Sequence, residues 1–140
     1  MTTDASLFTD IYALLAAFYG ALDDGTADEA AALFLPDGTW MRQGRLLTGP
    51  AAVRAALDER PADRATLHLF CNLRLSAITD DGCTATYGLF VNIGHDGPDT
   101  GHDDGRMLAL MTCSDHVRRT GQGWRFASRT ASLRFRNTLA

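Results

Sequence analysis

Residues 65–78 read ATLHLFCNLRLSAI, in which apolar side chains occupy every second position over most of the segment. This period of two is typical of a β-strand, because successive side chains of a strand point to opposite faces of the sheet. One face would carry His68, Phe70 and Asn72, a mixture that is typical of a cavity wall and also occurs on solvated sheet faces. The other face would be a continuous apolar row: Leu67, Leu69, Cys71, Leu73, Leu75 and Ala77.

The same period recurs further along the chain and predicts three more strands, over residues 83–95, 106–119 and 124–135. Before residue 65 the apolar period is instead about 3.6 residues, which predicts helices over 7–24, 27–35 and 51–60. Short strands are expected at 39–42 and 45–47. Helices followed by a run of antiparallel strands indicate an α+β domain with the helices packed on one face of the sheet.

Strands this long must coil, and a coiled sheet with helices across its concave side encloses space. We therefore expect a cone-shaped, strongly curved antiparallel sheet whose three N-terminal helices enclose a pocket. The chain has no internal repeat or linker, so residues 1–140 are expected to form a single domain.

Composition and charge exclude several classes of protein. A formal charge of −4 argues against a nucleic-acid partner that is bound by phosphate neutralisation. No apolar run approaches the roughly 20 residues that span a bilayer, and the N-terminus lacks the features of a secretory signal, so no membrane partner is expected. Cys71, Cys83 and Cys113 are odd in number and widely spaced, which favours reduced thiols in a cytoplasmic protein. Schiff-base chemistry is excluded because all 13 basic residues are arginines.

The first predicted helix places a carboxylate close to the expected cavity. A stripe centred on Phe18 should be buried, and Tyr12, Tyr19 and Asp23 lie along one margin of it. A hydrogen bond from His68 to Asp23 would fix the imidazole tautomer and raise its basicity. Asp23 could equally be an ordinary residue of the last helical turn, and periodicity does not choose between these interpretations.

Several short motifs follow one another in a characteristic order. They are Leu22-Asp23-Asp24-Gly25, Asp37-Gly38-Thr39-Trp40, Gly49-Pro50-Ala51-Ala52-Val53, His68-Leu69-Phe70-Cys71-Asn72 and Gly123-Trp124-Arg125-Phe126. Together they resemble SnoaL-like domains of the nuclear transport factor 2-like superfamily, and the resemblance covers most of the chain. It implies the cone-shaped α+β fold, in agreement with the expectation from the periodicity.

The resemblance also implies a catalytic site. Functional parallels in the superfamily are scytalone dehydratase, a bile-acid dehydratase and a hexachlorocyclohexane dehydrochlorinase. They imply an Asp–His dyad that maps onto Asp23 and His68, and an arginine of the last strand that maps onto Arg129. Tyr12 and Tyr19 are candidates for the hydroxyl that polarises a substrate carbonyl, and Tyr87 is a third. No cofactor and no metal are expected.

Other residues are expected to complete the site. The pocket wall would include Tyr12, Phe18, Phe34, Trp40, Phe70, Asn72, Tyr87 and Met111. His95 falls near the place of a second histidine in scytalone dehydratase. The stretch 95–104 contains two histidines and several aspartates, but it lacks the spacing of a known metal site, so a solvated loop is the better interpretation.

The predicted function is that of a cofactor-independent lyase or isomerase, similar to a dehydratase, acting on a small hydrophobic carbonyl-bearing molecule. One alternative is a polyketide-type aldol cyclase. Another is a non-catalytic binding or subunit-type module, such as the small subunit of a dioxygenase. Because the apolar face of strand 65–78 would lie outside the cone, a homodimer through the sheet is also expected.

Overall fold

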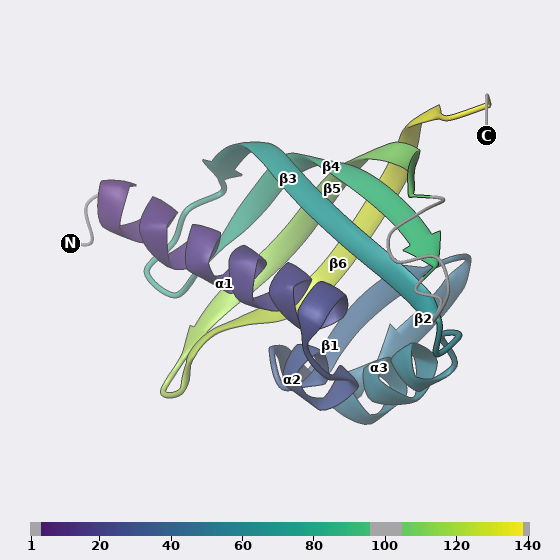
Figure 1. The fold of residues 1–140 in the computed structure, drawn as a ribbon. Coiled ribbons are helices and arrows are strands. Elements are labelled where there is room, and N and C mark those ends of the chain that lie inside the picture. Colours follow the sequence, from purple (N-terminus) through teal and green to yellow (C-terminus); the bar gives the residue numbers. More distant parts are fainter. Residues whose placement is uncertain (1–3, 96–104, 139–140) are drawn as a thin grey trace.

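The computed structural model describes residues 4–95 and 105–138 (Figure 1). The helices are α1 (Asp4–Asp24), α2 (Ala27–Ala31) and α3 (Gly49–Asp58), and the strands are β1 (Phe34–Arg42), β2 (Arg45–Thr48), β3 (Arg64–Ser76), β4 (Gly82–His95), β5 (Arg106–Thr120) and β6 (Gly123–Arg136). The strands form one six-stranded sheet in the order β2-β1-β6-β5-β4-β3. Neighbouring strands are antiparallel except β1 and β6, which are parallel. The predicted α+β fold with a strongly curved sheet is confirmed.

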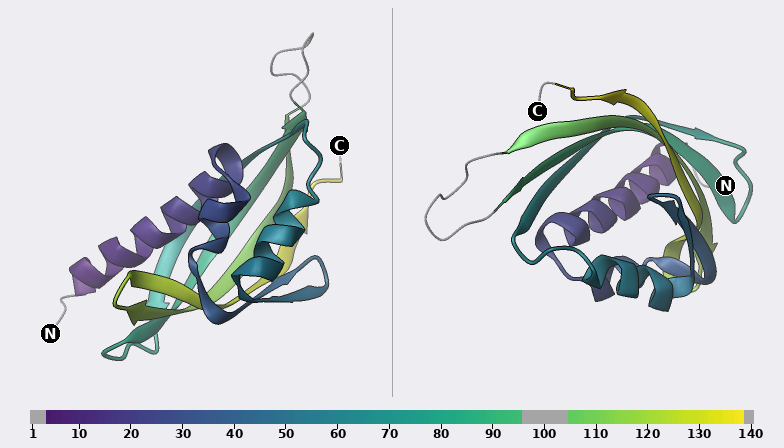
Figure 2. Two further views of the ribbon diagram at one scale, coloured as in Figure 1. Left: turned by 90° about the horizontal axis from the view of Figure 1, so that it is seen from below. Right: turned by 90° about the vertical axis from the view of Figure 1, so that its right-hand side faces the viewer.

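The sheet curls around α1, which lies across its concave side, and α2 and α3 cover one end (Figures 1 and 2). Helix α1 buries its apolar stripe completely at Ile11, Leu15 and Phe18, each 0% exposed. Contrary to expectation, the part of α1 from Ala5 to Asp24 is long and apolar enough to span a membrane by length and composition alone. Core helices and signal sequences pass the same test, so a single helix of this kind is weak evidence for a membrane span.

The segment after α2 differs from the prediction of a helix over 27–35. A capping box between Thr26 and Glu29 starts α2, but the helix ends at Ala31, and Phe34 already pairs with Phe126 of β6. The pairing buries Phe34, so long-range packing overrides local helix propensity here. The register then shifts around Gly38, where a Cβ atom would lie 2.6 Å from the carbonyl oxygen of Phe126, so only glycine fits.

A bulge at Asn72 divides β3 into two halves. The register with β4 shifts between Cys71 and Arg74, and Asn72 has a φ of 55°. Before the bulge Leu67 and Leu69 point outward, with exposures of 53% and 51%. After the bulge Leu73 and Leu75 pack against the core. The predicted continuous apolar outer face is therefore wrong, because one extra residue reverses the side-chain alternation.

Candidate active site

The last turn of α1 brings Asp23 against His68 of β3. Nδ1 of the His68 ring lies 2.6 Å from Oδ1 of Asp23, and the backbone N–H of His68 donates to Oδ2 at 2.8 Å. The hydroxyl of Thr66 donates to Oδ1 at 2.9 Å. The side chains of His68 and Asp23 are only 12% and 6% exposed. The structure thus joins the two residues that the sequence proposed as a dyad.

The surroundings keep Asp23 ionised. Burial alone would raise the pKa of this carboxyl, but the hydrogen bonds from the ring and backbone of His68, the charge of His68 and the bond from Thr66 together lower it. An ionised Asp23 accepts the Nδ1 proton of His68. The tautomer with a lone pair on Nε2 is then favoured, so Nε2 is the nitrogen available for chemistry.

His68 opens onto a cavity of about 270 Å³ between the concave face of the sheet and the end of α1. Sites for small molecules typically occupy roughly 300–1,000 Å³, so this cavity suits a small ligand. Four other residues that the sequence proposed for the site also line it: Tyr19, Trp40, Met111 and Arg129. The remaining wall is mostly apolar and comes from α1, β1 and the turn after it, β4, β5 and β6: Leu22, Met41, Leu89, Val91, Leu108, Ala109, Cys113 and Ala131, with Arg42, Gln43, Asp115 and Thr130.

Several predicted wall residues lie elsewhere. Phe18 and Phe34 are buried in the core, where their rings pack 5.9 Å apart. Tyr12 is 50% exposed and packs its ring on Phe70 at 4.9 Å, outside the cavity wall. Asn72 is exposed at the bulge, which corrects the expectation that it lines the pocket, because the prediction assumed an unbroken strand.

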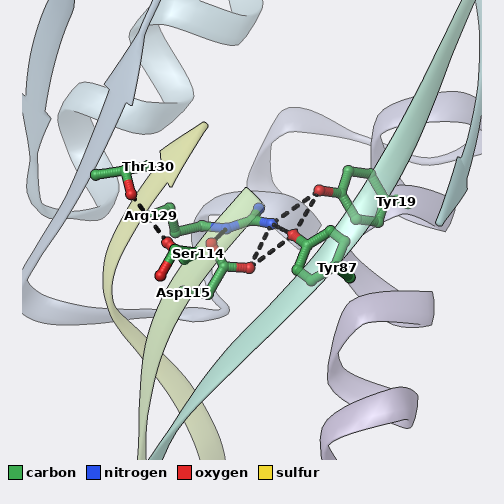
Figure 3. Close-up of polar contacts among 6 residues, drawn as sticks. All are labelled: Tyr19, Tyr87, Ser114, Asp115, Arg129 and Thr130. Carbon is green, nitrogen blue, oxygen red and sulfur yellow. Dashed lines mark hydrogen bonds and ion pairs between the residues drawn. The ribbon is translucent and has the colours of Figure 1, made fainter. Parts of the chain in front are cut away.

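In the cavity wall, Arg129 of β6 is the centre of a buried polar network (Figure 3). Its Nη2 donates to the hydroxyl oxygens of Tyr19 at 3.0 Å and Tyr87 at 2.7 Å, and to Oδ2 of Asp115 at 3.0 Å. Its Nε donates to Oδ1 of Asp115 at 3.2 Å. The guanidinium also stacks on the rings of Phe18 and Phe126, with Cζ 3.8 and 4.1 Å from their centroids. Its Nη1 is buried and has no hydrogen-bond partner among residues 4–95 and 105–138.

Asp115 completes this network, and the sequence reasoning did not assign it a role. It is 1% exposed and pairs in register with Arg129 across β5 and β6. A signal was available, because Met111, Cys113 and Asp115 fall on one face of the same strand. An acidic residue in that apolar row needs a cationic partner, and Arg129 on the next strand provides it.

Tyr19 connects the network to the dyad. Its ring stacks on the His68 ring with centroids 5.3 Å apart, and its hydroxyl lies 2.7 Å from that of Tyr87. Burial raises the pKa of both tyrosines, although the positive charge of Arg129 opposes the shift. Both phenols therefore remain protonated at neutral pH. Because the Tyr87 hydroxyl donates to Asp115, the Tyr19 proton can point to Tyr87 or into the cavity.

The predicted loop 96–104 and the side chain of His95 lie outside the described residues. Among the residues that are described, no group of three or more His, Cys, Asp or Glu side chains is arranged to hold a metal ion.

Comparison with known proteins gives the family. The model of the SnoaL-like domain matches residues 4–130. The chain belongs to this family. No match was found among curated proteins.

Solved structures show the same fold. A protein from Catenulispora acidiphila is 25% identical, with a TM-score of 0.81 and coverage of 94% of each chain. A structure from the same organism in complex with S-DNPA is also 25% identical, with a TM-score of 0.78 over 93% of this chain and 95% of the other. A type 2 hexachlorocyclohexane dehydrochlorinase is 15% identical, with a TM-score of 0.77 over 97% of this chain and 90% of the other.

Proposed function

We propose that this protein is a cofactor-independent lyase or isomerase that uses general acid/base catalysis on a small carbonyl-bearing molecule. The observation that carries the proposal is the 2.6 Å contact between Asp23 and Nδ1 of His68, with His68 on the cavity wall. A histidine oriented by a carboxylate is a base suited to neutral pH. A dehydrochlorinase, whose name describes an elimination, has the same fold, and a similar structure was solved in complex with S-DNPA.

In the proposed reaction, Nε2 of His68 removes a proton from the carbon next to the substrate carbonyl. The electron pair of that C–H bond moves onto the carbonyl oxygen, and Asp23 stabilises the imidazolium that forms. When the carbonyl re-forms, the electron pair expels a β-hydroxyl group. That group takes the proton back from His68 and leaves as water. Return of the proton to a different carbon would instead give an isomerisation.

Tyr19 is the proposed donor to the oxygen on which negative charge develops. It lines the cavity next to His68, and burial keeps its phenol protonated. Arg129 donates to the Tyr19 oxygen at 3.0 Å and supports the donation by its positive charge. Donors that are already fixed before the reaction stabilise such an oxyanion most effectively, and the network around Arg129 fixes this one.

Proton abstraction can be measured without knowledge of the natural substrate. In D₂O, the protein should catalyse deuterium exchange next to the carbonyl of small cyclic ketones such as 2-tetralone, followed by proton NMR. His68→Gln should lower the catalysed rate by about 10²–10⁴-fold, because glutamine can keep a hydrogen bond but cannot accept the proton. Asp23→Asn should have an equal or milder effect, since the two residues act as a unit.

His116→Gln is the matched control, because His116 is an exposed histidine that contacts Thr84 away from the cavity. It should leave the exchange rate unchanged. Exchange that persists in folded His68→Gln would contradict the assignment of the base. Absence of exchange with the wild-type protein would favour the non-catalytic binding module.

A further inference from the structure

Three arginines from separate elements meet next to the dyad. Arg42 ends β1, Arg60 follows α3, and Arg64 begins β3. All three line a cavity of about 150 Å³. This cavity adjoins the one described above, because His68 and Trp40 line both. The three guanidinium groups thus stand at one end of the space onto which His68 opens.

The acidic groups of the described residues that act on Arg42 and Arg60 have other partners as well. Among the described residues, the carboxylates that act on Arg42 and Arg60 are those of Glu59 and Asp23. Glu59 already forms a salt bridge with Arg45 at 3.1 Å, and Asp23 is hydrogen-bonded to His68. Three positive charges therefore gather here in a chain whose formal charge is −4.

The cluster is held in place at an electrostatic cost. Burial lowers the pKa of Arg42 and of Arg60, and the charges of the neighbouring arginines lower them further. Like charges in a half-buried position are unfavourable unless a counter-charge is bound there. An anionic ligand would relieve both the repulsion and the desolvation.

The donors are also preorganised. Arg60 donates from Nη1 to the carbonyl of Leu22 at 3.0 Å and from Nη2 to the hydroxyl of Thr66 at 3.1 Å. Thr66 in turn donates to Asp23, so Arg60 is connected to the dyad through one side chain. Nε of Arg64 is buried and has no hydrogen-bond partner among residues 4–95 and 105–138. A buried N–H group without a partner is costly and rare in proteins.

We propose that Arg42, Arg60 and Arg64 bind an anionic group of the substrate, a carboxylate or a phosphate ester. The apolar body of that substrate fills the larger cavity, and its carbonyl reaches His68. This inference rests on the proposed function for the position of the carbonyl, but binding of the anion does not require catalysis. Guanidinium groups suit both anions, because their N–H groups match pairs of oxygens on a carboxylate or a phosphate.

Binding of matched aromatic probes to the purified chain tests the proposal. The probes are 2-naphthoate and 2-naphthyl phosphate, compared with neutral 2-naphthamide by isothermal titration calorimetry at low salt. At least one anion should bind about tenfold more tightly than the amide, as expected for charge-assisted hydrogen bonds. The tighter of the two anions identifies the ligand class. Equal affinity of all three, or no measurable binding of either anion at millimolar concentration, would overturn the proposal.

Variants then assign the anion preference to the cluster. Arg42→Gln and Arg64→Gln should each weaken binding of the preferred anion several-fold and leave binding of the amide unchanged. Arg54→Gln is the matched control, because Arg54 is exposed on α3 and paired with Asp28. An equal loss in Arg54→Gln would mean that net charge alone steers the anion, which also contradicts a specific site.

His68→Gln separates the two proposals. This variant should keep the preference for the anion, because the arginines remain. Anion preference without ketone exchange in the wild-type protein would remove the proposed chemistry and leave the anion site. Ketone exchange without a preference for the anion would remove the anion site and leave the proposed chemistry.

Discussion

The carboxylate of Asp115 and the guanidinium of Arg129 lie opposite each other on β5 and β6, joined by contacts of 3.0 and 3.2 Å. Their side chains are 1% and 3% exposed, so the pair is almost completely removed from water. Burial disfavours the charge of the guanidinium, but Asp115 and the two neighbouring tyrosines outweigh this effect and raise the pKa of Arg129. Each charge is therefore stable in the core only because the other is present.

Removal of one partner should destabilise the fold strongly. Asp115→Asn is expected to lower the free energy of unfolding by about 3–5 kcal/mol, because Arg129 is left as an uncompensated buried charge. Urea denaturation measures this value. Asp28→Asn breaks the exposed pair with Arg54 and should cost less than about 1 kcal/mol. Equal costs for the two variants would contradict the stated role of the buried pair.

Asp23 should make stability depend on pH in the acidic range. Its folded-state pKa is lowered, so its contribution is fully present above the unfolded-state pKa of about 3.9 and is lost as the pH falls through the lower folded-state pKa. Near neutral pH, Asp23→Asn should cost about 1.5–3 kcal/mol through weakened charge-assisted hydrogen bonds. Thermal denaturation over a pH series should show the two curves converging in acid. A constant difference over that range would exclude this linkage.

The three cysteines should differ in reactivity. Burial raises the pKa of the Cys83 thiol, and burial together with the charge of Asp115 raises the pKa of Cys113 to about 11. Only the thiolate reacts with iodoacetamide, so the native protein at about pH 8 should be alkylated at Cys71 alone. Peptide mass spectrometry locates the label. As a control, the Cys71→Ser variant should remain unlabelled until urea is added. Rapid labelling of Cys113 in the native protein would contradict the expectation and show that the cavity wall formed by β5 opens.

The bulge in β3 should tolerate glycine and reject β-branched residues. Asn72 has a φ of 55°, a conformation that asparagine accepts and glycine adopts without steric cost. Asn72→Gly should therefore leave stability unchanged or raise it slightly. Asn72→Val should lower it by about 1–2 kcal/mol, measured by urea denaturation. A neutral valine variant would show that β3 can pair without the bulge.

The homodimer remains a prediction, now with a smaller apolar surface to support it. Leu67 and Leu69 are exposed on the outer side of β3. Light scattering after size-exclusion chromatography should give twice the mass of one chain at micromolar concentration. The double variant Leu67→Ser and Leu69→Ser should shift the protein to monomer. A wild-type monomer under these conditions would contradict dimerisation through the sheet.

Periodicity predicted the long elements well, because each of them is long enough to show its period. The predicted helix over 27–35 was wrong around Phe34, because Phe34 pairs with Phe126, which lies about ninety positions later in the sequence. The bulge was missed because the apolar residues of β3 alternate without interruption in the sequence. Only Asn72, a residue that accepts positive φ, hinted at the place where the alternation reverses.

The candidate site was predictable where the period of a single helix or strand already gives the direction of the side chain. Asp23 and His68 met this condition. Asp23 lies at the margin of the apolar stripe of α1, and the alternation of side chains along β3 points His68 toward the expected cavity. The network around Arg129 did not meet this condition, since it requires the register of β5 against β6, which places Asp115 beside Arg129. The arginine cluster joins the ends of three elements, and no local pattern contains that information.

The last two turns of α1 carry several contacts of the candidate site. Phe18 supports Arg129, Tyr19 stacks on His68, and Asp23 holds the imidazole. A substitution there would disturb core packing and the proposed chemistry together, so these two turns have little freedom to change. The facing wall at Leu108 and Ala131 can be altered without touching the dyad. Redesign of substrate choice should therefore start from β5 and β6, where cavity shape can vary while the reactive groups stay in place.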